Sequence, residues 1–308
     1  MNWNYYRKFG AEIELNAFDL RNKPLNEGSY PEGIQYVGNL VQKTTNEKVT
    51  IHKYGNDHHN DSWIIKPDGS CGLEVCTPVY KGLYSIKKIT SVIDAFKNDE
   101  KILADNRCSL HIHVDVSDLN QEQIAAILTW WIKCEMVFLD AVPTSRKRNR
   151  YCQVISQADF FDFTGLNLMS SETLIFNLGS CKYFTLNCYH LYNRRRSTIE
   201  FRIMDYEGCK NSEIIRNWIK LIIHFVEVSI SKGLPEGFNG DKWSSYLWLD
   251  PVDVFEFLGF NSSDLCEELK ETRDWFLRRL LRYTGSSLCG IMSDKARSHA
   301  RKELEILK

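Results

Sequence analysis

The strongest constraint on the fold is a repeated alternation of charged or histidine side chains with apolar ones. Glu12 and Glu14 alternate with Ala, Ile and Leu near the start of the chain, and His111 and His113 alternate with Leu, Ile and Val further along. A period of two is that of a β-strand, so the side chains of each pair project from the same face, roughly 7 Å apart. The alternation therefore predicts strands with one apolar face and one face that carries titratable groups.

The same pattern occurs in two further stretches. Glu200 and Arg202 alternate with Ile and Phe, and Glu74 lies between Leu73 and Val75. An exposed polar face would explain each stretch taken alone, and an ion pair of little energetic weight would explain Glu200 with Arg202. Four such strands together favour a functional site, because a solvated sheet face carries mostly Thr, Lys, Ser and Gln.

The order of the elements indicates an α+β fold, since helices lie between some strands while hairpins join others. We predict a catalytic domain over residues 1–235 and a helical extension over residues 236–308 that packs on it. The predicted strands are 9–15, 48–54, 62–66, 73–77, 108–116, 183–191 and 197–204, and the predicted helices are 33–41, 84–103, 121–142, 212–230, 252–258, 263–282 and 295–307.

Composition narrows the class of protein. The 308 residues carry a net charge of −1, so we expect neither nucleic acid nor an anionic membrane as a partner. The most apolar long stretch, residues 124–142, is interrupted by Lys133, Glu135 and Asp140 and suits an amphipathic helix better than a membrane span. The polar first residues and the absence of a zinc-like spacing among the ten cysteines predict a cytoplasmic protein with reduced thiols.

The candidate ligands favour a hard metal ion. Four glutamates with one or two histidines form an oxygen-rich set, which suits Mg²⁺ or Mn²⁺ better than Zn²⁺. Four carboxylates carry enough charge for two such ions. The sequence has no phosphate-binding loop of the Walker type and no Rossmann glycine pattern, so any ATP would have to be held by the sheet face itself.

These stretches, taken in order, resemble the amidoligase family of the glutamine synthetase and glutamate–cysteine ligase superfamily. The resemblance spans roughly residues 6–231. One departure is Gly208-Cys209, which stands where the family has Gly-Thr, and it concerns the local substrate contacts. The matching motifs are FGAEIEL at 9–15, DGS at 68–70, EVCTP at 74–78, LHIHV at 110–114 and TIEFR at 198–202.

The resemblance implies a curved, mainly antiparallel, glutamine synthetase-like sheet with two or more Mg²⁺ ions (or Mn²⁺) and ATP on its concave face. In that arrangement, Glu14 and Glu74 hold the ion nearer the substrate carboxylate. The ion that bridges the nucleotide phosphates is held by Glu12, His111 and Glu200.

The remaining implied roles concern the nucleotide and the reacting groups. His113 contacts a phosphate, and Arg202 binds the carboxylate or the transferring phosphoryl group. Asp68 and Asp115 are candidates for the base that takes the amine proton. The arginines predicted to bind phosphates or an acidic substrate are Arg146, Arg148, Arg150 and Arg196.

The expected activity is therefore ATP-dependent ligation of a carboxylate to an amine through an acyl phosphate, with an amino acid or a peptide or protein side chain as substrate. Three alternatives remain open at this point. The first is a phosphotransferase of the same fold, the second a zinc hydrolase built on His111 and His113, and the third a non-catalytic module that binds nucleotide or peptide. The sequence does not indicate the oligomeric state.

Overall fold

A computed structural model describes residues 6–17, 31–53, 61–155, 170–235, 248–283 and 290–306. The chain forms two compact units. We call the described residues within 6–114 and 204–219 the sheet unit, and those within 115–203 and 220–306 the helical unit. No helix in the described ranges is long and apolar enough to cross a membrane.

The sheet unit is built on strands that follow the predicted alternation. They are hydrogen-bonded in the order β2-β3-β4-β1-β6, and β5 pairs with the end of β1. The β2–β3 pair is parallel and the other pairs are antiparallel, as expected for a mainly antiparallel sheet. The strand bounds are β1 Phe9–Ala17, β2 Val49–Ile51, β3 Trp63–Asp68, β4 Gly72–Cys76, β5 Ile102–Leu103 and β6 Ser109–Asp115.

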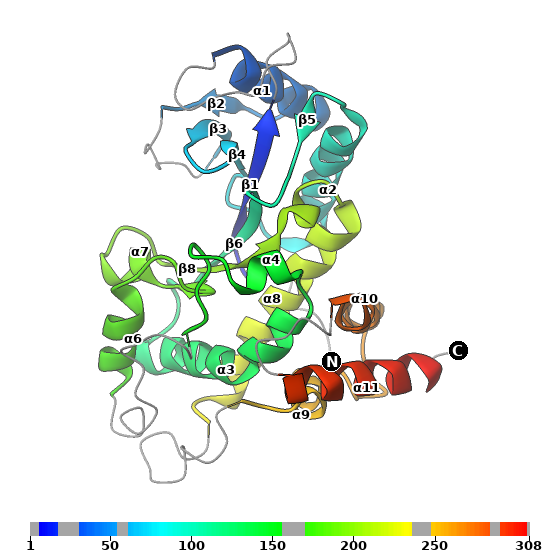
Figure 1. The fold of residues 1–308 in the computed structure, drawn as a ribbon. Coiled ribbons are helices and arrows are strands. Elements are labelled where there is room, and N and C mark those ends of the chain that lie inside the picture. The colour runs from blue at the N-terminus through cyan, green and yellow to red at the C-terminus, as the bar shows by residue number, and fades with distance from the viewer. Residues whose placement is uncertain are drawn as a thin grey trace. The chain divides into compact units, whose positions relative to one another are not determined.

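One face of this sheet is apolar and forms the core of the unit. Ile13 on β1, Val75 on β4 and Ile112 on β6 are fully buried. Helix α1 (Pro31–Thr45) packs against β1, β2, β3 and helix α2 (Gly82–Asn98) (Figure 1). Burial of this face fixes which side chains point the other way, because a strand alternates strictly.

The helical unit surrounds a core of aromatic side chains. Helix α11 contacts α3, α9 and α10 (Figure 1). Strand β8 and helix α8 begin in one unit and end in the other. A short 3₁₀ helix over Tyr206–Cys209 precedes α8. The other elements are α3 Gln121–Asp140, α4 Thr144–Lys147, α6 Ser171–Gly179, β7 Leu186–Asn187, α7 Tyr189–Tyr192, β8 Thr198–Asp205, α8 Ser212–Lys232, α9 Pro251–Phe257, α10 Glu267–Tyr283 and α11 Gly290–Ile306.

Helix α3 organises this core. Asn120 caps it in a reciprocal capping box with Gln123. Trp131 stacks on Phe138 with ring centroids 4.9 Å apart and meets Phe201 of β8 edge-on at 5.0 Å. Such aromatic contacts add to the stabilisation from burial, so α3 fixes the position of β8 within the helical unit.

A buried polar network joins α3 to the segment before β7. Glu135 is fully buried, accepts a hydrogen bond from the backbone N–H of Ile155 at 2.9 Å and accepts another from the Thr185 hydroxyl. Thr185 in turn accepts from the Trp131 indole at 3.0 Å, and its backbone oxygen accepts from the Arg202 N–H at 2.8 Å. The network satisfies groups that would be costly to bury alone.

The α+β class, the main strands and the long helices of the prediction are confirmed. The single strand predicted over 183–191 is wrong, because the chain turns after Asn187, whose side-chain oxygen accepts from the Tyr189 N–H at 2.8 Å. The helix predicted to reach residue 103 ends at Asn98, and residues 102–103 pair with β1 instead. The glutamine synthetase-like curvature and the domain boundary at residue 235 stay predictions.

Thr185→Val tests the buried network. The substitution keeps the shape of the side chain but leaves Glu135 and the Trp131 indole without the hydroxyl, so we expect a loss of about 2 kcal/mol in the free energy of unfolding. Thr129→Val is the matched control, because the buried Thr129 hydroxyl donates only to the carbonyl of Ala125 in its own helix. Urea unfolding of both variants measures the difference, and equal losses would contradict the role given to Thr185.

Candidate functional site

The polar face of the sheet unit brings four of the five predicted metal ligands, Glu12, Glu14, Glu74 and His111, into two adjacent rows. In one row, Glu14 on β1 is directly opposite Glu74 on β4, which is opposite Lys66 on β3. In the next row, Glu12 is opposite both Cys76 on β4 and His111 on β6. Directly opposite side chains on neighbouring strands lie close enough to interact, so the register itself assembles the cluster.

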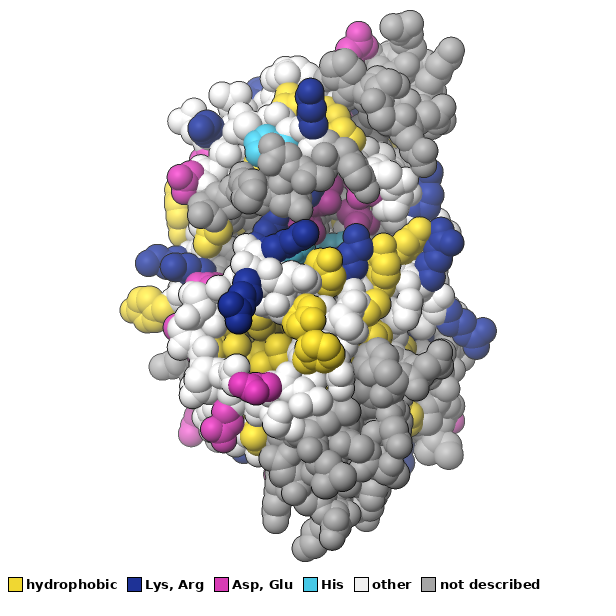
Figure 2. Space-filling view, turned by 90° about the vertical axis from the view of Figure 1, so that its left-hand side faces the viewer, with side chains coloured by type: hydrophobic (Ala, Val, Ile, Leu, Met, Phe, Trp, Pro, Cys, Tyr) yellow, Lys and Arg dark blue, Asp and Glu magenta, His cyan; other side chains and the backbone are white. Residues whose placement is uncertain are grey.

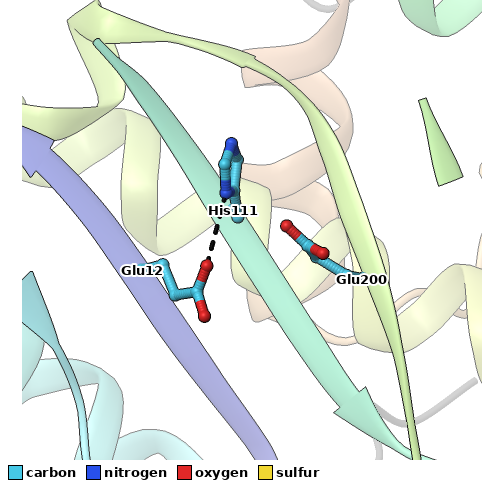
Figure 3. Close-up of side chains that lie close together, drawn as sticks. All are labelled: Glu12, His111 and Glu200. Carbon is cyan, nitrogen blue, oxygen red and sulfur yellow. Dashed lines mark hydrogen bonds and ion pairs between the residues drawn. The ribbon is translucent and has the colours of Figure 1, made fainter. Parts of the chain in front are cut away.

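Glu12 is the centre of this cluster. Its Oε1 lies 3.0 Å from Nε2 of His113, and its Oε2 lies 3.5 Å from Nδ1 of His111 (Figure 3). Burial alone would raise the pKa of Glu12, but the imidazoles of His113 and His111, together with the Lys66 ammonium, hold it well below its ordinary value. Glu12 is therefore a carboxylate that stays ionised and has an imidazole nitrogen close to each of its oxygens.

Glu14 is tied to strand β6. Its Oε2 accepts a hydrogen bond from the Ser109 hydroxyl at 2.7 Å, and its Oε1 lies 3.8 Å from Nε2 of His111. The same Ser109 hydroxyl lies 2.8 Å from that imidazole nitrogen. Ser109 thus holds both Glu14 and His111 in place from a single strand position, in the way that outer partners orient metal ligands.

Glu74 has a different environment. Its Oε1 is 3.2 Å from the Lys66 ammonium and accepts a hydrogen bond from the Cys76 thiol at 2.9 Å. Burial and the nearby charge of Glu12 raise the pKa of Glu74 to about 7, although Lys66 acts in the opposite direction. Near neutral pH, this carboxyl is therefore close to the midpoint of its titration when no metal ion is bound.

The residues present fit a divalent cation. Ligand atoms of Glu12, Glu74 and Cys76 lie within 4.8 Å of one another, as a shared ion requires. Figure 2 shows acidic side chains gathered together with basic side chains beside them. The two carboxylates of this set are ligands that Mg²⁺ and Mn²⁺ prefer, whereas a thiol suits softer ions, so the binding of Mg²⁺ or Mn²⁺ here stays a prediction.

Two predicted residues belong to β8 in the helical unit. Glu200, labelled in Figure 3, is buried, and its Oε2 accepts a hydrogen bond from the Asn187 side chain at 2.5 Å. Its other oxygen accepts from the guanidinium of Arg202. The Nε–H of Arg202 also donates a hydrogen bond to the backbone oxygen of Tyr151, with 3.4 Å between the nitrogen and the oxygen. Glu200 is thus held from two sides, which fixes its orientation on the strand.

The predicted phosphate-binding arginines differ in their surroundings. Arg146 is buried and donates to the backbone oxygen of Arg202, whereas Arg148 and Arg150 are exposed. Arg150 lies over the ring of Tyr151, with its guanidinium carbon 4.7 Å from the ring centroid. Arg196 is partly exposed next to β8. Their binding of phosphates stays a prediction.

Asp68 closes the turn between β3 and β4. Its Oδ1 accepts from the N–H groups of Ser70 at 2.7 Å and Cys71 at 3.1 Å. Burial would raise the pKa of Asp68, but these hydrogen bonds outweigh that effect and lower it. A carboxylate held in this way is a weaker base, and its role as proton acceptor stays a prediction.

Sequence reasoning missed Lys66 and Cys76. Both project from the polar face, and both contact Glu74. The signal lies in the pairing of β3 with β4, because the short turn over residues 69–71 fixes the register that places Lys66 opposite Glu74. Lys66 and Cys76 can be identified as site residues from their positions in the strand pair, which residue type alone does not give.

Glu74→Gln tests the raised pKa. Without metal, the folded wild type binds more protons than the unfolded chain between pH 4.5 and about 7, so its stability falls as pH rises through that window. The variant lacks this dependence, and its free energy of unfolding should rise relative to wild type by up to about 3 kcal/mol between pH 4.5 and pH 8.

The measurement is urea unfolding in EDTA at four pH values. Glu32→Gln, on the exposed first turn of α1, is the control and should shift little relative to wild type. A difference between Glu74→Gln and wild type that is constant with pH would contradict the assignment.

Comparison with known proteins gives the family. A family model described as "putative amidoligase enzyme" matches residues 6–226, whereas no curated protein matches the sequence. One similar solved structure is the bifunctional glutathione synthetase from Pasteurella multocida, with a TM-score of 0.42 and 12% sequence identity. The match covers 97% of this chain and 52% of that one, so this chain spans about half the length of that protein. Another is the glutamate–cysteine ligase from Francisella tularensis in complex with AMP, with a TM-score of 0.42 and 10% identity over 99% of this chain and 83% of that one. Since the family match covers most of its length, the chain belongs to the amidoligase family.

Proposed function

We propose that the protein is an ATP-dependent ligase that joins a carboxylate to an amine through an amide bond. The observation that carries the proposal is the carboxylate face of the sheet unit, where the buried Glu14 and Glu74 and the partly buried Glu12 lie on adjacent strands beside His111 and His113. Membership in the amidoligase family gives the reaction class that such a face would serve.

The chemical difficulty is that a carboxylate is a poor electrophile with a poor leaving group. Bound Mg²⁺–ATP would supply the phosphoryl group that turns the carboxylate into an acyl phosphate, which the amine then attacks. The protein's part is positioning and electrostatics, because an anionic triphosphate and an anionic substrate have to meet.

The charge of the sheet face predicts a strict need for a divalent cation. Glu12, Glu14 and Glu74 would repel a triphosphate, and like charges so close together destabilise each other unless a cation is shared between them. Glu12 with His111 would hold the ion that reaches the nucleotide, and Ser109 would keep Glu14 and His111 oriented toward it. His113 would contact a phosphate oxygen.

We also propose roles for two residues of β8. We propose Glu200 as a further metal ligand, which is why its fixed orientation by Asn187 matters. Arg202 would bind the substrate carboxylate or the transferring phosphoryl group, for which a planar guanidinium with several N–H donors is suited. Asp68 or Asp115 would accept the amine proton, and the substrate would be an amino acid or a peptide.

The test is release of ADP that depends on both Mg²⁺ and a carboxylate–amine pair. A panel of amino acids and peptides provides the pairs. Glu14→Ala and Glu200→Ala should each lower the rate by 100-fold or more, since removal of a group that stabilises developing charge costs about 3 kcal/mol. Glu100→Ala, at an exposed turn outside these strands, is the control and should keep the wild-type rate. Equal rates in all variants would sink the assignment.

The mass of the product separates ligation from simple phosphotransfer. A ligase releases ADP and phosphate together with an amide that has lost one water relative to its two substrates. A phosphotransferase would instead give ADP and a stable phosphorylated product. We expect the amide by mass spectrometry, and a metal analysis that finds magnesium or manganese and no stoichiometric zinc.

A further inference from the structure

Lys66 brings a side-chain ammonium into contact with the carboxylate cluster. Its ammonium lies 3.2 Å from Glu74 Oε1, and both side chains are about one-tenth exposed. The pair is fixed by register, because Lys66 and Glu74 are directly opposite on β3 and β4. A lysine is rarely buried to this degree without a specific partner.

The two carboxylates of the cluster that could share an ion are therefore not equivalent. Glu74 Oε1 has two donors from neighbouring strand positions, the Lys66 ammonium at 3.2 Å and the Cys76 thiol at 2.9 Å. Glu12 instead faces His113 and His111, whose imidazoles can be neutral and can themselves act as metal ligands. An ammonium has no lone pair to offer, so it competes with a metal ion for the Glu74 oxygen.

We propose that Lys66 serves as the built-in cation of Glu74, so that the cluster binds one divalent ion fewer than its carboxylates suggest. The inference rests on the proposed function and deepens it. The ion held by Glu12 and His111 remains, whereas the position next to Glu74, expected from the resemblance to hold a second ion, is taken by the ammonium. Charge neutralisation there is then independent of the metal concentration.

Electrostatics supports this arrangement. The cluster contains three carboxylates within two adjacent rows of the sheet, and one fixed positive charge removes part of the repulsion that a second ion would otherwise have to offset. A single ammonium carries half the charge of Mg²⁺ and has three N–H donors in place of open coordination positions. It would leave room for one fully coordinated ion beside it.

The test is the number of Mn²⁺ ions bound by the full chain without nucleotide, measured by the loss of the free-ion signal in electron paramagnetic resonance. Wild type should bind about one Mn²⁺ per chain. Lys66→Met keeps the length of the side chain without its charge and should bind about one more, while Lys66→Arg should stay at the wild-type number. Lys88→Met is the matched control, because Lys88 pairs with Glu47 outside the cluster and should not change the number.

A second variant keeps the proposal testable where Lys66→Met does not fold, as judged by circular dichroism. In Glu74→Gln, the wild-type ion should remain with its affinity changed less than about threefold, because Glu74 is not its ligand. Two ions in wild type, an unchanged number in folded Lys66→Met, or loss of the ion in Glu74→Gln would each overturn the inference.

The outcomes also separate this inference from the proposed function. Absence of any Mn²⁺ binding, together with no Mg²⁺-dependent ADP release, would count against the ligase itself. Two bound ions with normal ADP release would leave the ligase intact and remove only the role of Lys66.

Discussion

The repulsion among closely placed carboxylates on one sheet face is the constraint on which the rest of the sheet unit depends. Glu12, Glu14 and Glu74 are held together by register, and each has a different polar neighbour: imidazoles for Glu12, the Ser109 hydroxyl for Glu14 and the Lys66 ammonium for Glu74. Such an arrangement costs free energy and is tolerated because the opposite face of the same strands is fully apolar and buried. Burial of the apolar face thus offsets the free-energy cost of placing charged side chains close together on the polar face.

In the helical unit, packing and hydrogen bonds orient the polar side chains of β8. Glu200 and Arg202 lie on a strand that is fixed from behind by aromatic packing and by the buried Glu135–Thr185 network. Both oxygens of Glu200 are occupied, so the carboxylate is oriented before any ligand arrives. Pre-organisation of this kind lowers the free-energy cost of ordering side chains on binding.

The sequence predicted much of this because strand periodicity is a local property. Glu12, Glu14, His111 and His113 were placed on the correct face from alternation alone. The turn after Asn187 was missed, because it depends on a single side-chain hydrogen bond that no periodicity reports. Lys66 was missed because its importance lies in its cross-strand partner, and burial of Arg146 depends on contacts that arise only when distant segments fold together.

The turn after Asp68 shows how a local feature of the chain determines a contact between strands. The Asp68 carboxylate closes the loop between β3 and β4, and a slip of one residue there would carry Lys66 to the apolar side and set Ile65 or Pro67 against Glu74. The charge balance of the site is thus encoded partly in the length of the three-residue turn over residues 69–71, which contributes no ligand. An insertion or deletion at this turn that shifted the register would therefore separate Lys66 from Glu74 and alter the charge balance of the polar face.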